Sequence, residues 1–315
     1  MIEGDDLDLF ERSLEHATAS HTGPALDAAL EDLGWHDALA ADERAAVSRL
    51  FALQGTANVT SSALDDVLAH ALDRDRHAVV LPAIGRWTAP AALDRGRLTV
   101  DGLATASVRT RAVAVVVARV DETHSLFEFD ITTLRRRSID GVDPSLALVA
   151  VEGEIDGGTE IGPVDWPSAV ALGQLALGHE LVGASRRMLD LAREHALDRI
   201  QFGQPIAMFQ AVRHRLADTL VAIEAADAAL EAAWLDRASV SAAMAKAMAG
   251  RAARTACRHC QQVLAGIGFT TEHPFHRYVR RILVLEQLLG APRSLTRELG
   301  DEVLTTRLLP ALVPL

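Results

Sequence analysis

Cysteine and tyrosine are scarce in this 315-residue sequence, which contains two cysteines and a single tyrosine. The cysteines, Cys257 and Cys260, form one Cys-x-x-Cys with no second pair. Zinc sites of this type use two such pairs, and thioredoxin-like redox motifs follow a strand. These cysteines instead lie in an alanine-rich stretch typical of a packed helix. The sequence therefore predicts no metal site and no thioredoxin-like redox chemistry.

Long apolar runs and an excess of basic residues are also absent. No run of about 18 apolar residues, the length that spans a bilayer, occurs in the chain. The first residues, MIEGDDLDLFERS, are acidic where a secretion signal would be basic and then apolar. The net charge of −12 argues against nucleic acid or an anionic membrane as a partner. We therefore expect a cytoplasmic protein with neither of these partners.

Hydrophobic periodicity changes twice along the chain. Residues 1–77 show helical spacing, residues 78–160 contain short β-rich runs separated by Gly, Asp and Pro, and residues 161–315 show long helical periods. The pattern predicts an α+β fold with a helical N-terminal domain (1–77), a middle β-domain (78–160) and a C-terminal four-helix bundle (161–315). The last helix of that bundle is expected from Arg293 to Leu309.

A glycine corner interrupts the C-terminal helices at Ala265-Gly266-Ile267-Gly268. Each glycine costs about 1 kcal/mol inside a helix, so the preceding helix is expected to end here. Pro274 then precedes a second helix. Because glycine lets a backbone approach a neighbouring group closely, the corner is the strongest candidate for a binding site.

Two motifs in order resemble the acyl-CoA dehydrogenase family, flavoproteins that oxidise the Cα–Cβ bond of an acyl thioester. The upstream motif runs from Arg199 to Pro205 and continues with Phe209-Gln210. The downstream motif consists of Gln262, Ala265-Gly266, Gly268-Phe269, Thr271-Glu272-His273-Pro274 and Arg280-Arg281. Together they cover about residues 165 to 310. The resemblance implies that family's fold, here with a shortened helical N-terminal domain.

The resemblance also places the catalytic base, a glutamate that removes the α-proton, at one of two positions. In this sequence the two positions hold Leu289 and Arg251. Neither can act as a base, because leucine does not titrate and arginine stays protonated. Glu286 and, less favourably, Glu272 are the candidates for a relocated base.

In the family, half of the FAD site comes from the neighbouring subunit, and the motifs of this chain match that half. The resemblance implies that Arg199 pairs with phosphate oxygens, that Phe202 packs on the flavin, and that Gly266 lets backbone N–H groups approach the cofactor. The remaining expected FAD contacts are Gln210, Gln262 and Ala265. The family's ring-binding motifs are missing from the middle domain, where Trp87-Thr88 is expected in a loop.

Three hypotheses follow from the resemblance. The first is a subunit without its own base that completes the shared FAD of a catalytic partner, in an α2β2 acyl-CoA dehydrogenase like those of actinobacterial steroid side-chain oxidation. The second is an active homomeric enzyme with a relocated base. The third is a structural or acyl-CoA-binding relative that holds no flavin.

Overall fold

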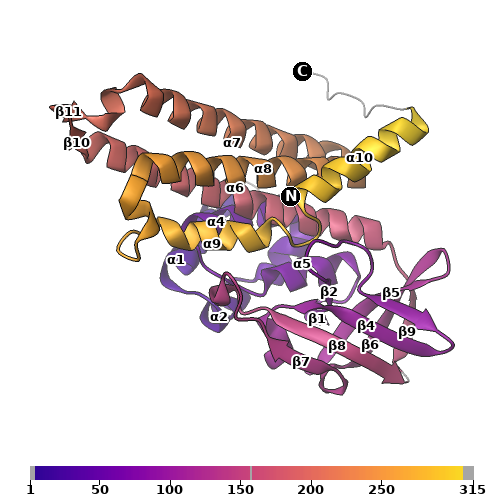
Figure 1. The fold of residues 1–315 in the computed structure, drawn as a ribbon. Helices are drawn as coiled ribbons and strands as arrows, with labels where there is room; N and C mark the ends of the chain where they lie inside the picture. The colour runs from indigo at the N-terminus through magenta and orange to yellow at the C-terminus, as the bar shows by residue number, and fades with distance from the viewer. Residues whose placement is uncertain (1–3, 157, 308–315) are drawn as a thin grey trace.

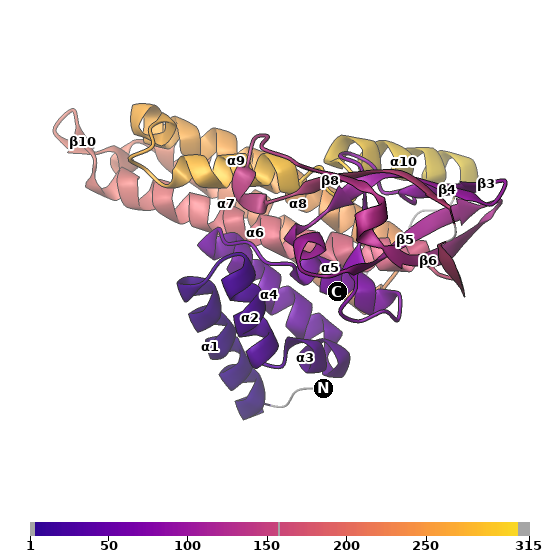
Figure 2. The same ribbon diagram turned by 90° about the horizontal axis from the view of Figure 1, so that it is seen from below.

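The structure, a computed structural model, describes residues 4–156 and 158–307. Five helices form the N-terminal part (Figure 1). Asp42 caps the fourth of these helices, α4, by accepting a hydrogen bond from the Ala45 backbone N–H at 3.0 Å. Figure 2 shows these helices on one side of the long helices. Their bounds are α1 Gly4–Ser20, α2 Pro24–Asp32, α3 Trp35–Ala41, α4 Glu43–Ala57 and α5 Ala63–Ala71.

The middle of the chain forms one mostly antiparallel sheet in the order β7-β8-β4-β3-β5-β6-β9, with β1 added beside β5 and β2 beside β4. Strand β4 alternates exposed and buried residues, the pattern of a sheet with one covered face. The bounds are β1 Ala78–Val79, β2 Leu81–Pro82, β3 Ala91–Asp94, β4 Arg97–Ala104, β5 Val113–Val120, β6 Thr123–Asp130, β7 Arg135–Ser138, β8 Val149–Asp156 and β9 Thr159–Pro163.

The β-rich runs expected within residues 78–160 correspond to strands, whereas β3, β7 and β9 were not predicted. All four residues of β7, Arg-Arg-Arg-Ser, are exposed. A charged edge strand carries no apolar alternation, and such edges resist pairing with other chains. Its strand conformation therefore depends on pairing with β8 and leaves no signal in the sequence.

The C-terminal half consists of long helices that lie side by side (Figure 1). Helix α6 starts where Asp165 accepts a hydrogen bond from the Ser168 N–H at 3.1 Å. It approaches α4 very closely, because a Cβ on Gly183 would lie 2.1 Å from the Ala52 carbonyl oxygen. The predicted Leu309 end of the last helix lies outside the described residues. The bounds are α6 Trp166–Asp198, α7 Gln210–Asp236, α8 Ser239–Leu264, α9 Phe275–Leu285 and α10 Pro292–Thr306.

The predicted α+β architecture of helices, sheet and helical bundle is confirmed. One apolar core extends from the N-terminal helices through the bundle, and a second lies within the sheet. None of the helices in the described ranges is long and apolar enough to cross a membrane.

A buried arginine of α9 joins the parts of the molecule. Arg281 is 1% exposed, and its Nε donates to Asp143 Oδ2 at 2.8 Å. Its Nη1 donates to the Val59 carbonyl at 2.6 Å and to Glu180 Oε1 at 3.3 Å, and its Nη2 donates to Thr60 Oγ1 at 2.8 Å. Burial raises the pKa of Glu180 to about 7, although Arg281 opposes the shift. This network fixes α9, and with it the glycine corner, against α6, the loop after α4 and the loop between β7 and β8.

Candidate flavin-binding groove

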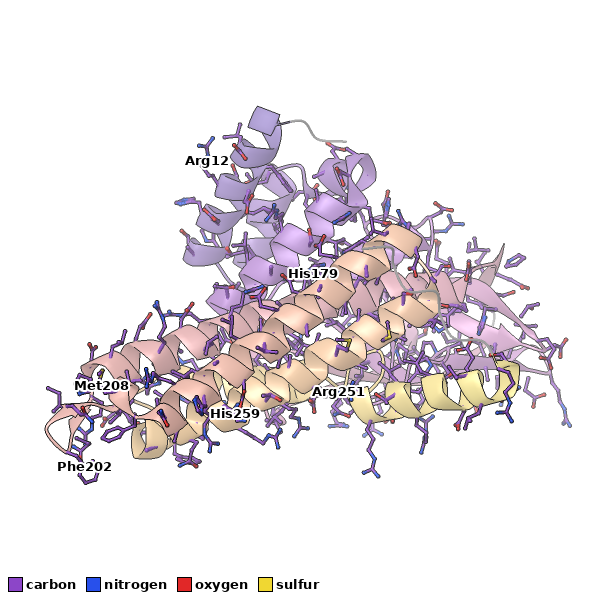
Figure 3. The ribbon with its side chains drawn as sticks, turned by 90° about the horizontal axis from the view of Figure 1, so that it is seen from above. Arg12, His179, Phe202, Met208, Arg251 and His259 are labelled. Carbon is purple, nitrogen blue, oxygen red and sulfur yellow. The ribbon has the colours of Figure 1, made fainter. Side chains whose placement is uncertain are left out.

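A two-residue hairpin at the far end of the bundle holds Phe202 outward. Strand β10, Ile200–Gln201, pairs with β11, Gln204–Pro205, and the turn residues Phe202 and Gly203 have φ of 53° and 80°. Positive φ at both central residues is the pattern of a type I′ turn, which favours Asn and Gly. The phenylalanine side chain is 92% exposed and contacts Phe209 edge to face at 6.1 Å between ring centroids. Figure 3 shows it at the tip of the molecule.

The glycine corner presents bare backbone at the same end of the bundle. Helix α8 ends at Leu264, and Ala265 follows with φ 52° and ψ −131°. That region favours glycine, so alanine there stores about 1–3 kcal/mol of strain. A Cβ placed on Gly266 would meet no atom within 4 Å. The packing of this chain therefore does not require glycine at position 266.

The hairpin and the corner enclose a groove of about 710 Å³, called the bundle-end groove. It is bordered by five of the six predicted FAD contacts, and Gln210 lies beside it at the start of α7. Arg199 and Arg215 also make it basic, and no carboxylate is among the described residues that line it. The predicted contacts in the groove are Arg199, Phe202, Gln262, Ala265 and Gly266.

The guanidinium of Arg199 is available to a ligand. Its side chain is exposed and forms no ion pair with Asp198 or with any other residue in the described ranges. The pKa of the neighbouring His195 is lowered by burial and by the charge of Arg199. A neutral histidine beside an unpaired arginine leaves the arginine as the strong anion ligand of this groove.

Neither predicted base position carries an acid that faces a cavity. Leu289 is 1% exposed and fills the space beside Gly173, where an added Cβ would lie 2.5 Å from Leu289 Cδ1. The Gln174 amide donates to the Leu289 carbonyl at 2.9 Å, which holds this segment against α6. Arg251 is exposed on α8 and lines a groove that Leu289 does not border.

The two candidates for a relocated base lie outside the bundle-end groove. Glu286 is 2% exposed and accepts hydrogen bonds from Arg254 Nε at 2.7 Å and from Gln287 Nε2 at 3.0 Å. Arg254 Nη2 binds its other oxygen. Glu272 is exposed in the turn before α9. With both oxygens engaged by donors, Glu286 is poorly placed to take up a proton.

Lys246, which sequence reasoning missed, supports the segment that contains Leu289. It is the only lysine in the sequence, and it is fully buried. Its Nζ donates to the carbonyls of Glu286 at 3.0 Å and Gly290 at 3.4 Å. Burial lowers its pKa to about 7, although the charge of Glu286 opposes the shift. The sequence signal that could have revealed this buried residue is a single lysine within the alanine-rich stretch of α8.

A second cavity of about 860 Å³ lies between the sheet, the start of α6 and α10. Trp87 and Thr88 line it from a loop between β2 and β3, as the sequence predicted. The Trp166 indole donates to the Trp87 carbonyl at 3.0 Å. Burial and the charge of Glu302 raise the pKa of Glu298 at its border. Its walls come from distant segments, so sequence spacing gave no sign of it.

Comparison with known proteins finds a similar family for the C-terminal half of the chain. Residues 168–304 match the family described as "Acyl-CoA dehydrogenase, C-terminal domain". This part of the chain is similar to that family. Acyl-CoA dehydrogenase IpdE2 of Mycobacterium tuberculosis is 39% identical over 137 residues. That match covers 44% of this chain and 43% of the relative, so it spans less than half of either protein.

Solved acyl-CoA dehydrogenases share the fold of nearly the whole chain. A variant of the Tcur3481-Tcur3483 steroid ACAD matches with a TM-score of 0.81 and 20% identity over 96% of this chain and 99% of its own. The ChsE4-ChsE5 complex of Mycobacterium tuberculosis matches with a TM-score of 0.75 and 20% identity over 98% and 99%. These comparisons confirm the predicted acyl-CoA dehydrogenase fold.

The matched residues 168–304 contain both motifs that carried the resemblance. The hairpin of the upstream motif and the corner of the downstream motif are about 60 residues apart in sequence, and tertiary structure brings them to one groove. The assignment of these residues to FAD remains a prediction.

Proposed function

We propose that this chain is the subunit without a catalytic base in a heteromeric, flavin-dependent acyl-CoA dehydrogenase. The observation that carries the proposal is the bundle-end groove, which presents an unpaired Arg199 and the open face of Gly266 at the end of the bundle, while Leu289 and Arg251 hold the base positions. The partner subunit supplies the glutamate and the ring-binding half of the site. The expected assembly is α2β2.

The residues of the groove fit one half of an FAD molecule. Arg199 suits a diphosphate, because a guanidinium can donate two parallel hydrogen bonds to phosphate oxygens. Phe202 offers an exposed ring for packing, and Gly266 leaves its backbone open to a close approach. The unfavourable backbone conformations of Phe202 and Ala265 support a binding role, because such strain concentrates at ligand sites. When bound, FAD supplies the acceptor for the hydride from the β-carbon of an acyl-CoA.

The names of the matched proteins support a partner and suggest a substrate class. Two structural neighbours are named as assemblies of two components, Tcur3481-Tcur3483 and ChsE4-ChsE5, and the first is named a steroid ACAD. We propose an acyl-CoA thioester as the substrate of the complex, with a steroid side chain as the leading candidate for its acyl group.

The two alternative functions have weaker support. An active homomer requires a relocated base, but the Glu286 carboxylate is occupied by Arg254 and Gln287 and borders neither the bundle-end groove nor the cavity beside Trp87. A flavin-free relative would leave the unpaired Arg199 and the strained corner without a role. Glu286→Gln tests the first alternative: a relocated base requires that this variant lose turnover, and retained activity would reject it.

The deciding experiment compares the chain purified alone with the chain coexpressed with the product of the neighbouring gene. Visible absorption reports bound flavin, and light scattering reports the mass. We expect flavin bands and an α2β2 mass only in the coexpressed sample. Stoichiometric flavin on the chain alone would refute the shared site, and a colourless coexpressed complex would favour the flavin-free relative.

Two variants separate binding from folding in the same complex. Phe202→Asn places the preferred residue in the type I′ turn, so the chain should remain folded while the complex loses flavin. Arg199→Gln should weaken flavin retention by about tenfold or more, since one charge-assisted hydrogen-bonding group is lost. Arg193→Gln, an exposed change on α6 that lines neither the groove nor the cavity, is the matched control. Equal flavin content in all three variants would contradict the assignment.

A further inference from the structure

Strand β7 ends the sheet on one side, and β9 ends it on the other (Figure 1). Strand β7 pairs with β8 through all four of its residues, from Arg135 opposite Glu152 to Ser138 opposite Val149. The register has no shift, so the strand is regular over its whole length. A regular edge strand presents main-chain N–H and C=O groups that can pair with another strand. Strand β7 therefore has the backbone geometry that accepts one more strand.

The main-chain groups of Arg136 and Ser138 point away from β8. Just beyond the strand, the Ile139 N–H donates to the Leu148 carbonyl at 2.9 Å. Bonding alternates along an antiparallel pair, so Arg137 does not share the outward direction of its two neighbours. No hydrogen bond uses the N–H and C=O groups of Arg136 and Ser138 within the described part of the chain. An incoming strand would find two donors and two acceptors there.

The opposite edge, β9, is protected against such pairing. Its register against β6 shifts after Leu126, so Ile161 has no partner on β6 and the strand bulges. Gly162 has a φ of 139°, and Pro163, which has no N–H, ends the strand. Bulges and prolines are common devices against edge-to-edge pairing. Strand β7 contains neither, and three successive arginines take their place.

The positive charge of β7 is only partly neutralised. Arg135 Nη1 lies 3.1 Å from Glu152 Oε1, but both side chains are exposed, so this ion pair is weak. Arg136 Nη1 donates to the Val108 carbonyl at 3.0 Å, which holds its guanidinium beside the strand. Arg137 is exposed and forms no ion pair within the described residues. The edge therefore carries net positive charge in a chain whose total is −12.

The alternation of side chains decides which charges an added strand would meet. Arg135 lies opposite the exposed Glu152 on the solvent face of the sheet, and Arg137 shares that face. Arg136 lies opposite Val151, which is fully buried, and so on the core face. Opposite charges on neighbouring strands stabilise their pairing, and like charges destabilise it. The arginines that repel a neutral or basic edge would thus favour a strand with acidic residues on its solvent face.

We propose that β7 is a docking edge for a partner protein that adds an extended, acidic segment to the sheet. Main-chain hydrogen bonds to Arg136 and Ser138 hold the segment, and the arginines select its charge. A nucleic acid or an anionic membrane would meet the same arginines, but neither has a regular row of peptide groups that matches the strand. No residue of β7 lines the bundle-end groove, so the inference does not depend on the proposed shared FAD site.

Fluorescence anisotropy of the full chain at low salt tests the inference with a labelled heptapeptide of alternating glutamate and valine. We expect this peptide to bind and a matched peptide of alternating lysine and valine not to bind. Two N-methylated forms keep the charge but lose the N–H groups of one edge, because alternate residues of a strand point their N–H groups to the same side. In an antiparallel pair the valine N–H groups face β7, so methylation at valine should abolish binding and methylation at glutamate should not.

Variants of β7 separate the main-chain contribution from the charge. Ser138→Pro removes an outward N–H without affecting the ladder with β8, and should weaken peptide binding about fivefold, the contribution of one hydrogen bond. Arg135→Gln together with Arg137→Gln should weaken binding about tenfold, or threefold for each cross-strand pair. Arg193→Gln, an exposed change on α6, should leave the affinity unchanged. Circular dichroism checks that each variant is folded.

Amide hydrogen exchange measured by nuclear magnetic resonance gives a second readout. Bound peptide should slow exchange at Arg136 and Ser138, whereas ionic adhesion alone would leave their N–H groups exposed. The inference fails if the glutamate–valine peptide does not bind, if both N-methylated forms bind equally, or if exchange at these two residues is unchanged. Tighter binding of an octathymidine oligonucleotide or of phosphatidylglycerol vesicles would show that the edge takes a nucleic acid or a membrane instead. Each of these outcomes leaves the proposed function standing.

Discussion

The only lysine of the chain should titrate more than three pH units below its ordinary range. Lys246 is fully buried on α8, with two backbone carbonyls as its hydrogen-bond acceptors. Burial penalises the charged ammonium and lowers its pKa from 10.5 to about 7. At about 1.36 kcal/mol per pH unit, the shift corresponds to a change of about 5 kcal/mol in the free energy of unfolding between pH 7 and pH 10.5.

The sign of the pH dependence follows from proton counting. Between pH 7 and 10.5 the unfolded chain keeps the lysine protonated while the folded chain loses the proton. The unfolded state binds more protons there, so stability rises with pH. Between about pH 7 and pH 8.5 the free energy of unfolding should increase by about 1.5 kcal/mol relative to Lys246→Met. This window avoids Cys260, whose thiol pKa is raised by burial from 9.0 to about 12.

Two assays test the prediction. Urea unfolding of the wild type and of Lys246→Met across this window gives the difference in stability, in which contributions from all other groups cancel. Nuclear magnetic resonance of protein labelled with ¹³C at the lysine ε-carbon gives the pKa directly, because one lysine yields one signal. A titration midpoint near that of free lysine, together with parallel stability curves, would refute the reasoning.

Three further predictions concern stability. Ala265→Gly should raise the free energy of unfolding by about 1 kcal/mol, because glycine adopts a φ of 52° without strain, and this gain exceeds the entropy that glycine adds to the unfolded chain; a lower urea midpoint would contradict this. Arg281→Met should cost about 3–5 kcal/mol at neutral pH, because it leaves Asp143 and Glu180 buried without their counter-charge; the loss should shrink at pH 5, where Glu180 takes up a proton. Asp65 is fully buried, and burial raises its pKa from 3.8 to about 7. Between these pH values the folded protein binds more protons than the unfolded chain, so its free energy of unfolding falls as pH rises. Asp65→Asn should therefore unfold at higher urea than the wild type at pH 8, and the advantage should fall by about 2 kcal/mol at pH 5.5; an unchanged difference would reject the raised pKa.

Local sequence predicted the parts of the fold that have a strong period. The helical spacing of the N-terminal and C-terminal parts and the β-rich runs between them are apolar patterns that depend on neighbouring residues. The strands β3, β7 and β9 were missed because they are short and lack a clear apolar alternation; β3 forms a tight hairpin with β4, and β7 and β9 pair with β8 and β6. The charged β7 is the clearest case, since only its ladder with β8 makes it a strand.

The sequence by itself gave the candidate flavin residues, because the two motifs that resemble the acyl-CoA dehydrogenase family are local in the chain. It named Arg199, Phe202 and Gly266 without a structure. Only the tertiary structure decided that the hairpin and the corner border one groove and that Arg199 has no ionic partner among the described residues. It also showed that Lys246 is fully buried. Burial and contacts between side chains far apart in sequence depend on how the helices pack. The spacing of residues within one segment therefore cannot predict them.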